Sequence, residues 1–198
     1  PPVLMVLGDL SLLNKQRVGI VGARNASFHG KRLAETMATD LGKSDFAVVS
    51  GFARGIDAAA HQGALGSGTI AVLGTGLGHI YPECHKDLFF KIKESGLFVT
   101  HFAYDTGPQT QNFPIRNRLI AWLSHGVIVI EAAYQSGSLI TAEHALECGH
   151  EVFAVPGAPY DPRCRGSNKL IKDGIVSKED FDKMKKEFKN LLDEQFKT

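Results

Sequence analysis

The sequence predicts an α/β fold with a doubly wound, mostly parallel sheet that is flanked by helices on both faces. Short β-branched runs alternate with segments of helical periodicity along the chain, which is typical of successive βαβ units. The runs Val18–Val21 and Val127–Ile130 are apolar on both faces, as strands between two layers of helices must be. The connections are short, so we expect right-handed crossovers between parallel strands.

Six strands are expected, and each is a short run rich in β-branched or other apolar residues. The fifth begins directly after a turn residue, Gly126. In chain order the expected strands span Arg17–Gly22, Phe46–Gly51, Thr69–Gly74, Leu97–Phe102, Val127–Glu131 and Glu151–Pro156. Between them, apolar side chains recur at helical spacing, most clearly at Leu33, Met37 and Leu41 and at Leu119, Ile120 and Leu123.

The end of the chain differs in character from the rest. We expect one domain over residues 1–176 and an amphipathic helical tail over 177–198, because apolar residues there fall at helical spacing. These residues are Phe181, Met184, Phe188, Leu191 and Leu192. The apolar face that these residues form either packs on the sheet of its own domain or binds a partner protein. The tail carries equal numbers of lysines and acidic residues, so all eight arginines of the chain precede it.

Composition excludes several classes of protein. With 43% hydrophobic and 22% charged residues, the 198-residue chain is expected to be globular, and its apolar runs are too short to cross a membrane. The first residues carry no charged stretch and no cleavage site, and they lack an initiator methionine. We therefore expect no signal peptide and a start inside a longer product. Three cysteines without C-x-x-C spacing favour reduced thiols, so a cytoplasmic location is expected.

Glycine and arginine gather where the expected strands end. Glycine lets a backbone approach a ligand closely, helix N-termini offer free N–H groups, and arginine suits phosphate. The segments are Gly22-Ala23-Arg24-Asn25, Ser50-Gly51-Phe52-Ala53-Arg54-Gly55, Gly74-Thr75-Gly76-Leu77-Gly78, Arg116-Asn117-Arg118 and Ser136-Gly137-Ser138. Each alone is explained as well by a surface arginine, a tight turn or a helix cap. Because such strand ends meet at one edge of a sheet, we expect a shared anion site there.

Several familiar sites are missing from the sequence. It contains no G-x-G-x-x-G dinucleotide fingerprint, no G-x-x-x-x-G-K-[ST] phosphate loop and no G-x-S-x-G elbow, and we expect no cofactor. His144 and Cys148 lie four residues apart near His150 and Cys164, but a structural zinc site needs a second ligand pair, so no metal is expected. Asp57 and His61 are interpreted as a helix-start acid and a packed histidine rather than an acid–base couple.

Five segments in order along the chain form a continuous pattern. They are Val21–Arg24, Ser50–His61, Phe113–Ala121, Glu131–Ala142 and Phe153–Gly157. Together they resemble the DprA/Smf family of DNA-processing proteins, over about Val3 to Ile175. Thr100-His101 departs from the serine–glutamate that is common in that family.

The resemblance implies a Rossmann-like core that binds single-stranded DNA without sequence preference and has no catalytic residues. Members of the family dimerise, protect incoming strands and load RecA recombinase during natural transformation. Arg24, Arg54, Arg116 and Arg118 would face the DNA backbone, and the helix start at Ser136–Ser138 would cap a phosphate. The implied DNA-binding residues are Arg24, Gly51, Arg54, Gly55, Phe113, Arg116, Asn117, Arg118, Ser136, Gly137 and Ser138.

Phe113 is open to two interpretations, a core residue or an exposed ring that stacks a base. The polar loop at 106–112 and the extended backbone expected before Pro114 favour exposure, with the next helix beginning at Ile115. An enzymatic alternative is also open, because the fold resembles that of LOG-type phosphoribohydrolases, in which Arg116 and Glu143 would occupy comparable places. The P-G-G-x-G-T-x-x-E loop of those enzymes is absent.

Overall fold

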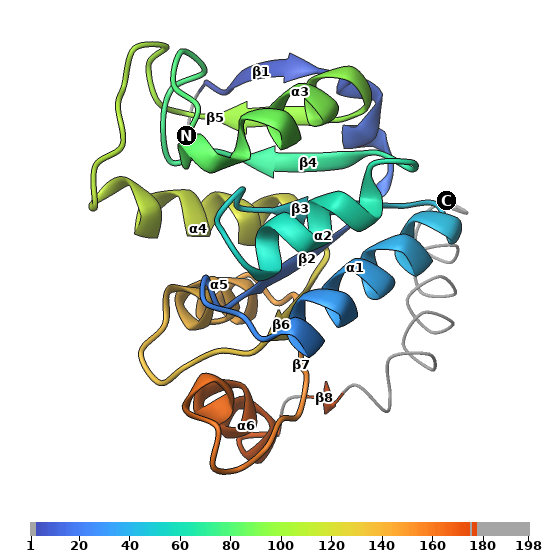
Figure 1. The fold of residues 1–198 in the computed structure, drawn as a ribbon, viewed down its shortest axis with the longest axis vertical. Coiled ribbons are helices and arrows are strands. Elements are labelled where there is room, and N and C mark those ends of the chain that lie inside the picture. Colours follow the sequence, from blue (N-terminus) through green and yellow to red (C-terminus); the bar gives the residue numbers. More distant parts are fainter. Residues whose placement is uncertain (1–2, 175, 178–198) are drawn as a thin grey trace.

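The computed structural model describes residues 3–174 and 176–177, and within them it contains one eight-stranded sheet (Figure 1). The strand order is β1-β5-β4-β3-β2-β6-β7-β8, and every neighbouring pair is parallel except β1 with β5. The strands are β1 (Met5–Gly8), β2 (Gln16–Gly22), β3 (Phe46–Ser50), β4 (Thr69–Val72), β5 (Leu97–Thr100), β6 (Gly126–Ile130), β7 (Glu151–Ala154) and β8 (Val176–Ser177). The expected fold class is confirmed.

All six expected strands are present, and their ends differ from expectation by two residues at most. Two further strands were not expected. β1 is a short antiparallel edge strand, and β8 has only two residues, so neither carries the long apolar run of a central parallel strand. The tail expected at 177–198 lies, apart from Ser177, outside the described residues.

Helices cover both faces of the sheet, as the apolar strands require. α1 to α3 lie in front of the sheet in Figure 1, and α4 lies behind it. The α-helices are α1 (Phe28–Lys43), α2 (Ile56–Ala64), α3 (Lys86–Ser95), α4 (Asn112–Leu123), α5 (Gly137–Glu147) and α6 (Arg165–Lys172). Three short 3₁₀ helices accompany them: η1 (Leu10–Asn14), η2 (Glu83–His85) and η3 (Pro162–Cys164). No helix among the described residues is both long and apolar enough to cross a bilayer.

The two helical layers bury separate sides of the same strands. Met37 and Leu41 of α1 pack with Ile20 and Val48 in one core cluster. Leu119 of α4, with its neighbours Ile120 and Ala121, belongs to the cluster on the other side of the sheet. The helical stripes expected from the sequence therefore face the core.

The strand order reverses beside β2. From β2 the chain passes to β3, β4 and β5 on one side, and α4 then carries it across to β6 on the other side of β2. In a doubly wound sheet, loops diverge at such a reversal and leave a crevice at the carboxyl ends of the strands. The described fold places this crevice at the ends of β2 and β6.

Candidate nucleic-acid interface

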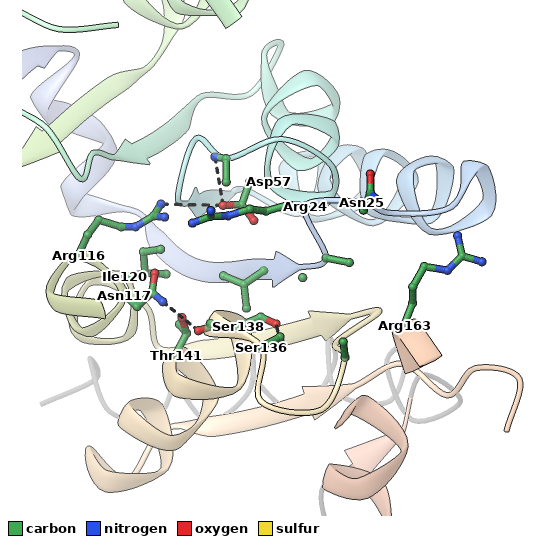
Figure 2. Close-up of a pocket in the computed structure, with 16 residues that line it drawn as sticks. Arg24, Asn25, Asp57, Arg116, Asn117, Ile120, Ser136, Ser138, Thr141 and Arg163 are labelled. Atoms are coloured by element: carbon green, nitrogen blue, oxygen red, sulfur yellow. Dashed lines mark hydrogen bonds and ion pairs between the residues drawn. The ribbon is translucent and has the colours of Figure 1, made fainter. Parts of the chain in front are cut away.

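A cavity of about 500 Å³ occupies the crevice at the ends of β2 and β6. In Figure 2, Arg24 and Asp57 lie along one wall, Ser136 and Ser138 lie opposite, and Arg163 lies at the far end. Four of the five loop segments singled out in the sequence contribute to it. The lining residues are Val21, Gly22, Ala23, Arg24, Asn25, Ala53, Asp57, Arg116, Asn117, Ile120, Ala133, Ser136, Gly137, Ser138, Thr141 and Arg163.

A smaller cavity adjoins the first over the ends of β3 and β4. Arg24, Ala53 and Arg116 line both cavities, so the two cavities meet at these residues. The other residues that line the smaller cavity are Gly51, Phe52, Arg54, Leu73, Gly74, Thr75, Tyr81, Pro82 and Phe113. Gly74-Thr75, the fifth segment expected from the sequence, therefore joins the same region of the surface.

Phe113 lies in the first turn of α4 and is half-buried. Its ring centroid is 5.2 Å from the guanidinium carbon of Arg24 and 5.9 Å from that of Arg116. The ring also lies 5.7 Å from the ring of Tyr81 and packs against the backbone at Gly74, where a Cβ would come within 2.9 Å of it. The side chain is thus neither fully buried nor fully exposed, and one part of it faces the smaller cavity.

The start of α4 differs from the sequence-based expectation. The helix begins at Asn112 rather than Ile115, with Pro114 inside its first turn. A proline fits there because amide groups in the first turn have no partner within the helix. Phe113 is consequently fixed to a helix instead of ending a loop.

Arg116 was expected to face the DNA backbone, but the structure places it in the interior, 3% exposed. Its Nη1 donates to the carbonyl oxygen of Gly51 and, at 3.3 Å, to that of Val72. Any side chain at Gly51 would collide with this guanidinium, so the glycine makes room for the arginine rather than for a ligand. Burial lowers the pKa of Arg116 to about 10, despite the opposing effect of Asp57.

Asp57 is the buried partner of this arginine. Its Oδ2 lies 3.9 Å from Nη1 of Arg116 and accepts a hydrogen bond from the amide of Ala53 at 3.3 Å. Burial raises the pKa of the carboxyl group, whereas the charge of Arg116 opposes this shift.

The interpretation of Asp57 and His61 as structural residues is confirmed by the contacts of the histidine. His61 is fully buried, and its Nε2 accepts a hydrogen bond from the amide of Phe52 at 3.3 Å. Its Nδ1 therefore carries the proton and donates to Oγ1 of Thr69 at 2.7 Å. Burial lowers the pKa of His61 to about 3, so the ring is a neutral core residue.

The other expected arginines are exposed, but they do not all lie at the site. Arg24 and Arg54 line the cavities. Arg118 lines neither, and its guanidinium carbon lies 5.9 Å from the centroid of the Trp122 ring on the same helix. Two residues correspond to about 200° around a helix, so Arg118 must point away when Arg116 points inward.

The start of α5 presents unoccupied donors to the larger cavity. Ser136 is the N-cap residue, as expected, but its hydroxyl makes no capping bond and instead lies 2.7 Å from that of Ser138. Asn117 is 8% exposed and donates from Nδ2 to the carbonyl oxygen of Gly137 at 2.9 Å, which holds this helix start in place. No described residue accepts a hydrogen bond from the amides of Gly137 and Ser138.

The helices α1 and α2 do not offer such a terminus at this edge. Glu131 accepts hydrogen bonds from both the amide and the hydroxyl of Ser27, the N-cap of α1. The amide of Ile56, which begins α2, donates to the carbonyl oxygen of Ala23 at 3.1 Å. Gly55 allows this approach, since its φ of +80° and its contact with Ala23 leave no place for a side chain. At α5, by contrast, the amides of both Gly137 and Ser138, which line the larger cavity, have no acceptor among the described residues.

Sequence reasoning missed Arg163 and Tyr81 as residues of the cavities. Arg163 lies in η3, the first helix after β7, and it forms an ion pair with Asp161 at 2.6 Å. The available signal was its position after a strand, the same signal that identified the other loops. Tyr81 had no comparable signal, because proximity to Phe113 depends on the path of a long loop.

Arg116 and Glu143, the two residues that the phosphoribohydrolase alternative requires, do not lie together. Glu143 is exposed and lines neither cavity, whereas Arg116 is buried beneath both.

Within the described residues, no group of three or more histidine, cysteine or acidic side chains is placed to hold a metal, and all three cysteines are free. Thr100, at the position where the family commonly has serine, donates to the carbonyl oxygen of Thr75 at 2.8 Å and so holds the loop after β4.

Comparisons with known proteins agree with the resemblance noted in the sequence. The chain matches the family described as DNA recombination-mediator protein A over residues 1–189, somewhat beyond the expected limit at Ile175. DNA processing protein DprA of Bacillus subtilis is 42% identical over 187 residues, which are 91% of this chain and 63% of that protein. The chain spans between 45% and 63% of the length of the curated relatives it matches.

Two solved structures share the fold closely. The X-ray structure of DprA from Streptococcus pneumoniae has a TM-score of 0.84 and 43% identity, covering 88% of this chain and 62% of that chain. DprA from Helicobacter pylori has a TM-score of 0.85 and 30% identity, covering 97% of this chain and 87% of that chain. The H. pylori structure was determined to describe how that protein binds single-stranded DNA.

Proposed function

Because this chain belongs to the DprA/Smf family of DNA recombination-mediator proteins, we propose that it binds single-stranded DNA at the two adjoining cavities, without preference for base sequence. One observation carries the proposal. The half-buried ring of Phe113 lies within 6 Å of the guanidinium carbons of both Arg24 and Arg116 and beside the ring of Tyr81, at the ligand-binding edge of the sheet. Aromatic rings and arginines together are the usual means of holding unpaired bases and their phosphates.

The absence of sequence preference follows from this chemistry. Every base presents a flat face that stacks on an aromatic ring, and phosphate contacts position a strand without reading its sequence. We assign stacking to Phe113 and Tyr81, and phosphate contact to the exposed Arg24 and Arg54. Duplex DNA should bind more weakly, because its bases are already stacked inside the helix.

The remaining expected site residues receive supporting roles in this proposal. Arg116 positions the Phe113 ring from below, and Gly51 leaves space for its guanidinium. Gly55 leaves space for the Arg24 loop, which is held by the hydrogen bond from the amide of Ile56 to the carbonyl oxygen of Ala23. At α5, Asn117 holds the start of the helix, while Ser136, Gly137 and Ser138 provide donors for a phosphate. Arg118 is left outside the site.

The finer functions implied by the family are part of the same proposal. We infer a non-catalytic role in which the protein, as a homodimer in the cytoplasm, protects incoming strands and helps to load RecA during natural transformation. Membership of the DprA/Smf family supports these more specific functions. Analytical ultracentrifugation tests the homodimer, and a strand-exchange assay with RecA tests the loading.

Binding of fluorescent oligo-dT at several salt concentrations tests the central proposal. If Arg24 and Arg54 contact phosphates, log affinity should fall with log salt at a slope of about −1.4, from roughly −0.7 per contact. Equal affinity for single strands and duplex, or a flat dependence on salt, would contradict the proposal.

A further inference from the structure

We propose that the larger cavity binds a nucleotide through a terminal phosphate, a phosphomonoester at a strand end or on a free nucleoside monophosphate. The inference rests on the proposed function where the phosphate belongs to a strand. The cavity has a volume of about 500 Å³, within the usual range for small-ligand sites of about 300–1,000 Å³. Arg24, Arg116 and Arg163 line it together with one carboxylate, that of Asp57, so the lining favours an anion.

The donors on one wall are placed to hold a phosphate group. The amides of Gly137 and Ser138 are open, and the hydroxyls of Ser136 and Ser138 lie beside them. A phosphodiester has two free oxygens and one negative charge, whereas a terminal phosphate has three free oxygens and a charge of about −1.5 to −2. A helix N-terminus favours the larger negative charge.

A second observation also indicates an anionic or strongly polar occupant. Nε of Arg116 is buried and has no hydrogen-bond partner among the described residues, although the side chain is 97% buried and lines the cavity. A buried donor without a partner is unfavourable, and an acceptor that reached Nε from the cavity would stabilise this arrangement.

The charges on the two sides of the cavity are not equally neutralised. Arg163 is paired with Asp161 at 2.6 Å, and Arg116 is paired with Asp57. Arg24 forms no ion pair with any described residue. The unneutralised positive charge therefore lies where the two cavities join, opposite the start of α5 (Figure 2).

The shared lining connects a terminal nucleotide to the rest of a strand. A strand whose last nucleotide fills the larger cavity would pass Arg24 and Ala53 and then reach the ring of Phe113. The larger cavity would thus hold the end of a strand. The smaller cavity, of about 30 Å³, is too small for a base, so the bases that follow would lie over its rim beside Phe113.

Binding of internally labelled oligo-dT strands with a 5′-phosphate, a 3′-phosphate or hydroxyl ends tests the inference. We expect about tenfold tighter binding of one phosphorylated strand, or displacement of the strand by dTMP but not by thymidine. The first result assigns the site to strand ends, and the second assigns it to free nucleotides. Equal binding of all three strands, together with no effect of dTMP, would overturn the inference. Binding of the hydroxyl-ended strand still reports the proposed function separately.

Gly137→Pro and Gly137→Ala form a matched pair for locating the phosphate. Proline removes the amide donor but suits the first helical position, and Ser136 already has the extended backbone, φ −74° and ψ 153°, that precedes a proline. Alanine keeps the amide, and its Cβ would meet only Nδ2 of Asn117, at 3.4 Å. The preference for the phosphorylated ligand should be at least fivefold smaller in Gly137→Pro than in Gly137→Ala, with similar melting temperatures. An equal preference in both variants would exclude the start of α5 as the phosphate site.

Discussion

Nη1 of Arg116 lies 3.9 Å from Oδ2 of Asp57, and both side chains are almost completely buried beneath the two cavities. Arg116 contacts the ring of Phe113 from one side, and the guanidinium of Arg24 lies over the same ring. The buried pair therefore supports the part of the surface to which we assign base stacking. Its role in base stacking is positional, since only 4% of the Arg116 side chain and 8% of the Asp57 side chain are exposed.

Asp57→Asn should destabilise the protein by about 3 kcal/mol, because it leaves the charge of Arg116 buried without a partner. Urea unfolding at neutral pH measures the loss. The double variant Asp57→Asn/Arg116→Met should recover part of the stability, since it removes the unpaired charge. Additive losses in the double variant would show that the two side chains are not energetically coupled.

Stability should fall as the pH is lowered from 7.5 to 5, because His61 stays neutral in the folded protein. Its pKa is about 3 in the folded state, compared with an ordinary value of 6.5, so the unfolded chain gains a proton first. The stabilisation is complete above pH 6.5 and is lost at about 1.4 kcal/mol per pH unit below it, or about 2 kcal/mol at pH 5. Denaturant unfolding should show a smaller pH dependence in His61→Gln. An unchanged dependence would contradict the assignment.

Arg24→Ala and Arg54→Ala should each weaken oligo-dT binding and reduce the slope of log affinity against log salt by about 0.7. Both side chains are exposed and line the cavities. Arg118→Ala is the matched control, because Arg118 is also exposed but lies on the outer side of α4 with Trp122. A loss of binding in Arg118→Ala equal to that in Arg24→Ala would place the strand on a different surface.

Phe113→Ala should weaken oligo-dT binding about tenfold, the effect of losing one stacked base. It should also lower the melting temperature by roughly 5 °C, because a half-buried ring contributes about half the stability of a core phenylalanine. Phe113→Leu separates the two effects, since leucine keeps apolar packing against Gly74 but has no flat ring. We expect Phe113→Leu to melt near the wild type and to bind as weakly as Phe113→Ala. Wild-type affinity in Phe113→Leu would remove Phe113 from the stacking role.

Incubation with nucleoside 5′-monophosphates should release no free base. The residues that the hydrolase alternative requires are separated, with Arg116 buried and Glu143 exposed outside both cavities. Chromatography of the reaction mixture measures the release. Turnover that disappears in Glu143→Ala would favour the enzyme over the binding protein.

The sequence by itself determined the fold class and the edge at which a ligand would bind. Runs such as Val127–Ile130 are apolar on both faces, which requires a covered parallel sheet, and the six expected strands were confirmed. The segments that end these strands, including those around Arg24, Arg54 and Ser136, then had to meet at one edge, because parallel strands all end on the same side. Local pattern was sufficient for these conclusions.

Only the tertiary structure decided which of the arginines reaches solvent. Arg116 and Arg118 are two residues apart in one motif, yet one is buried against Gly51 and Asp57 and the other lies outside on Trp122. Arg163 joins the cavity from a loop more than a hundred residues away from Arg24. Burial, ion pairing and the closing of a cavity depend on elements that are distant in the chain, and periodicity along the sequence carries no information about those contacts.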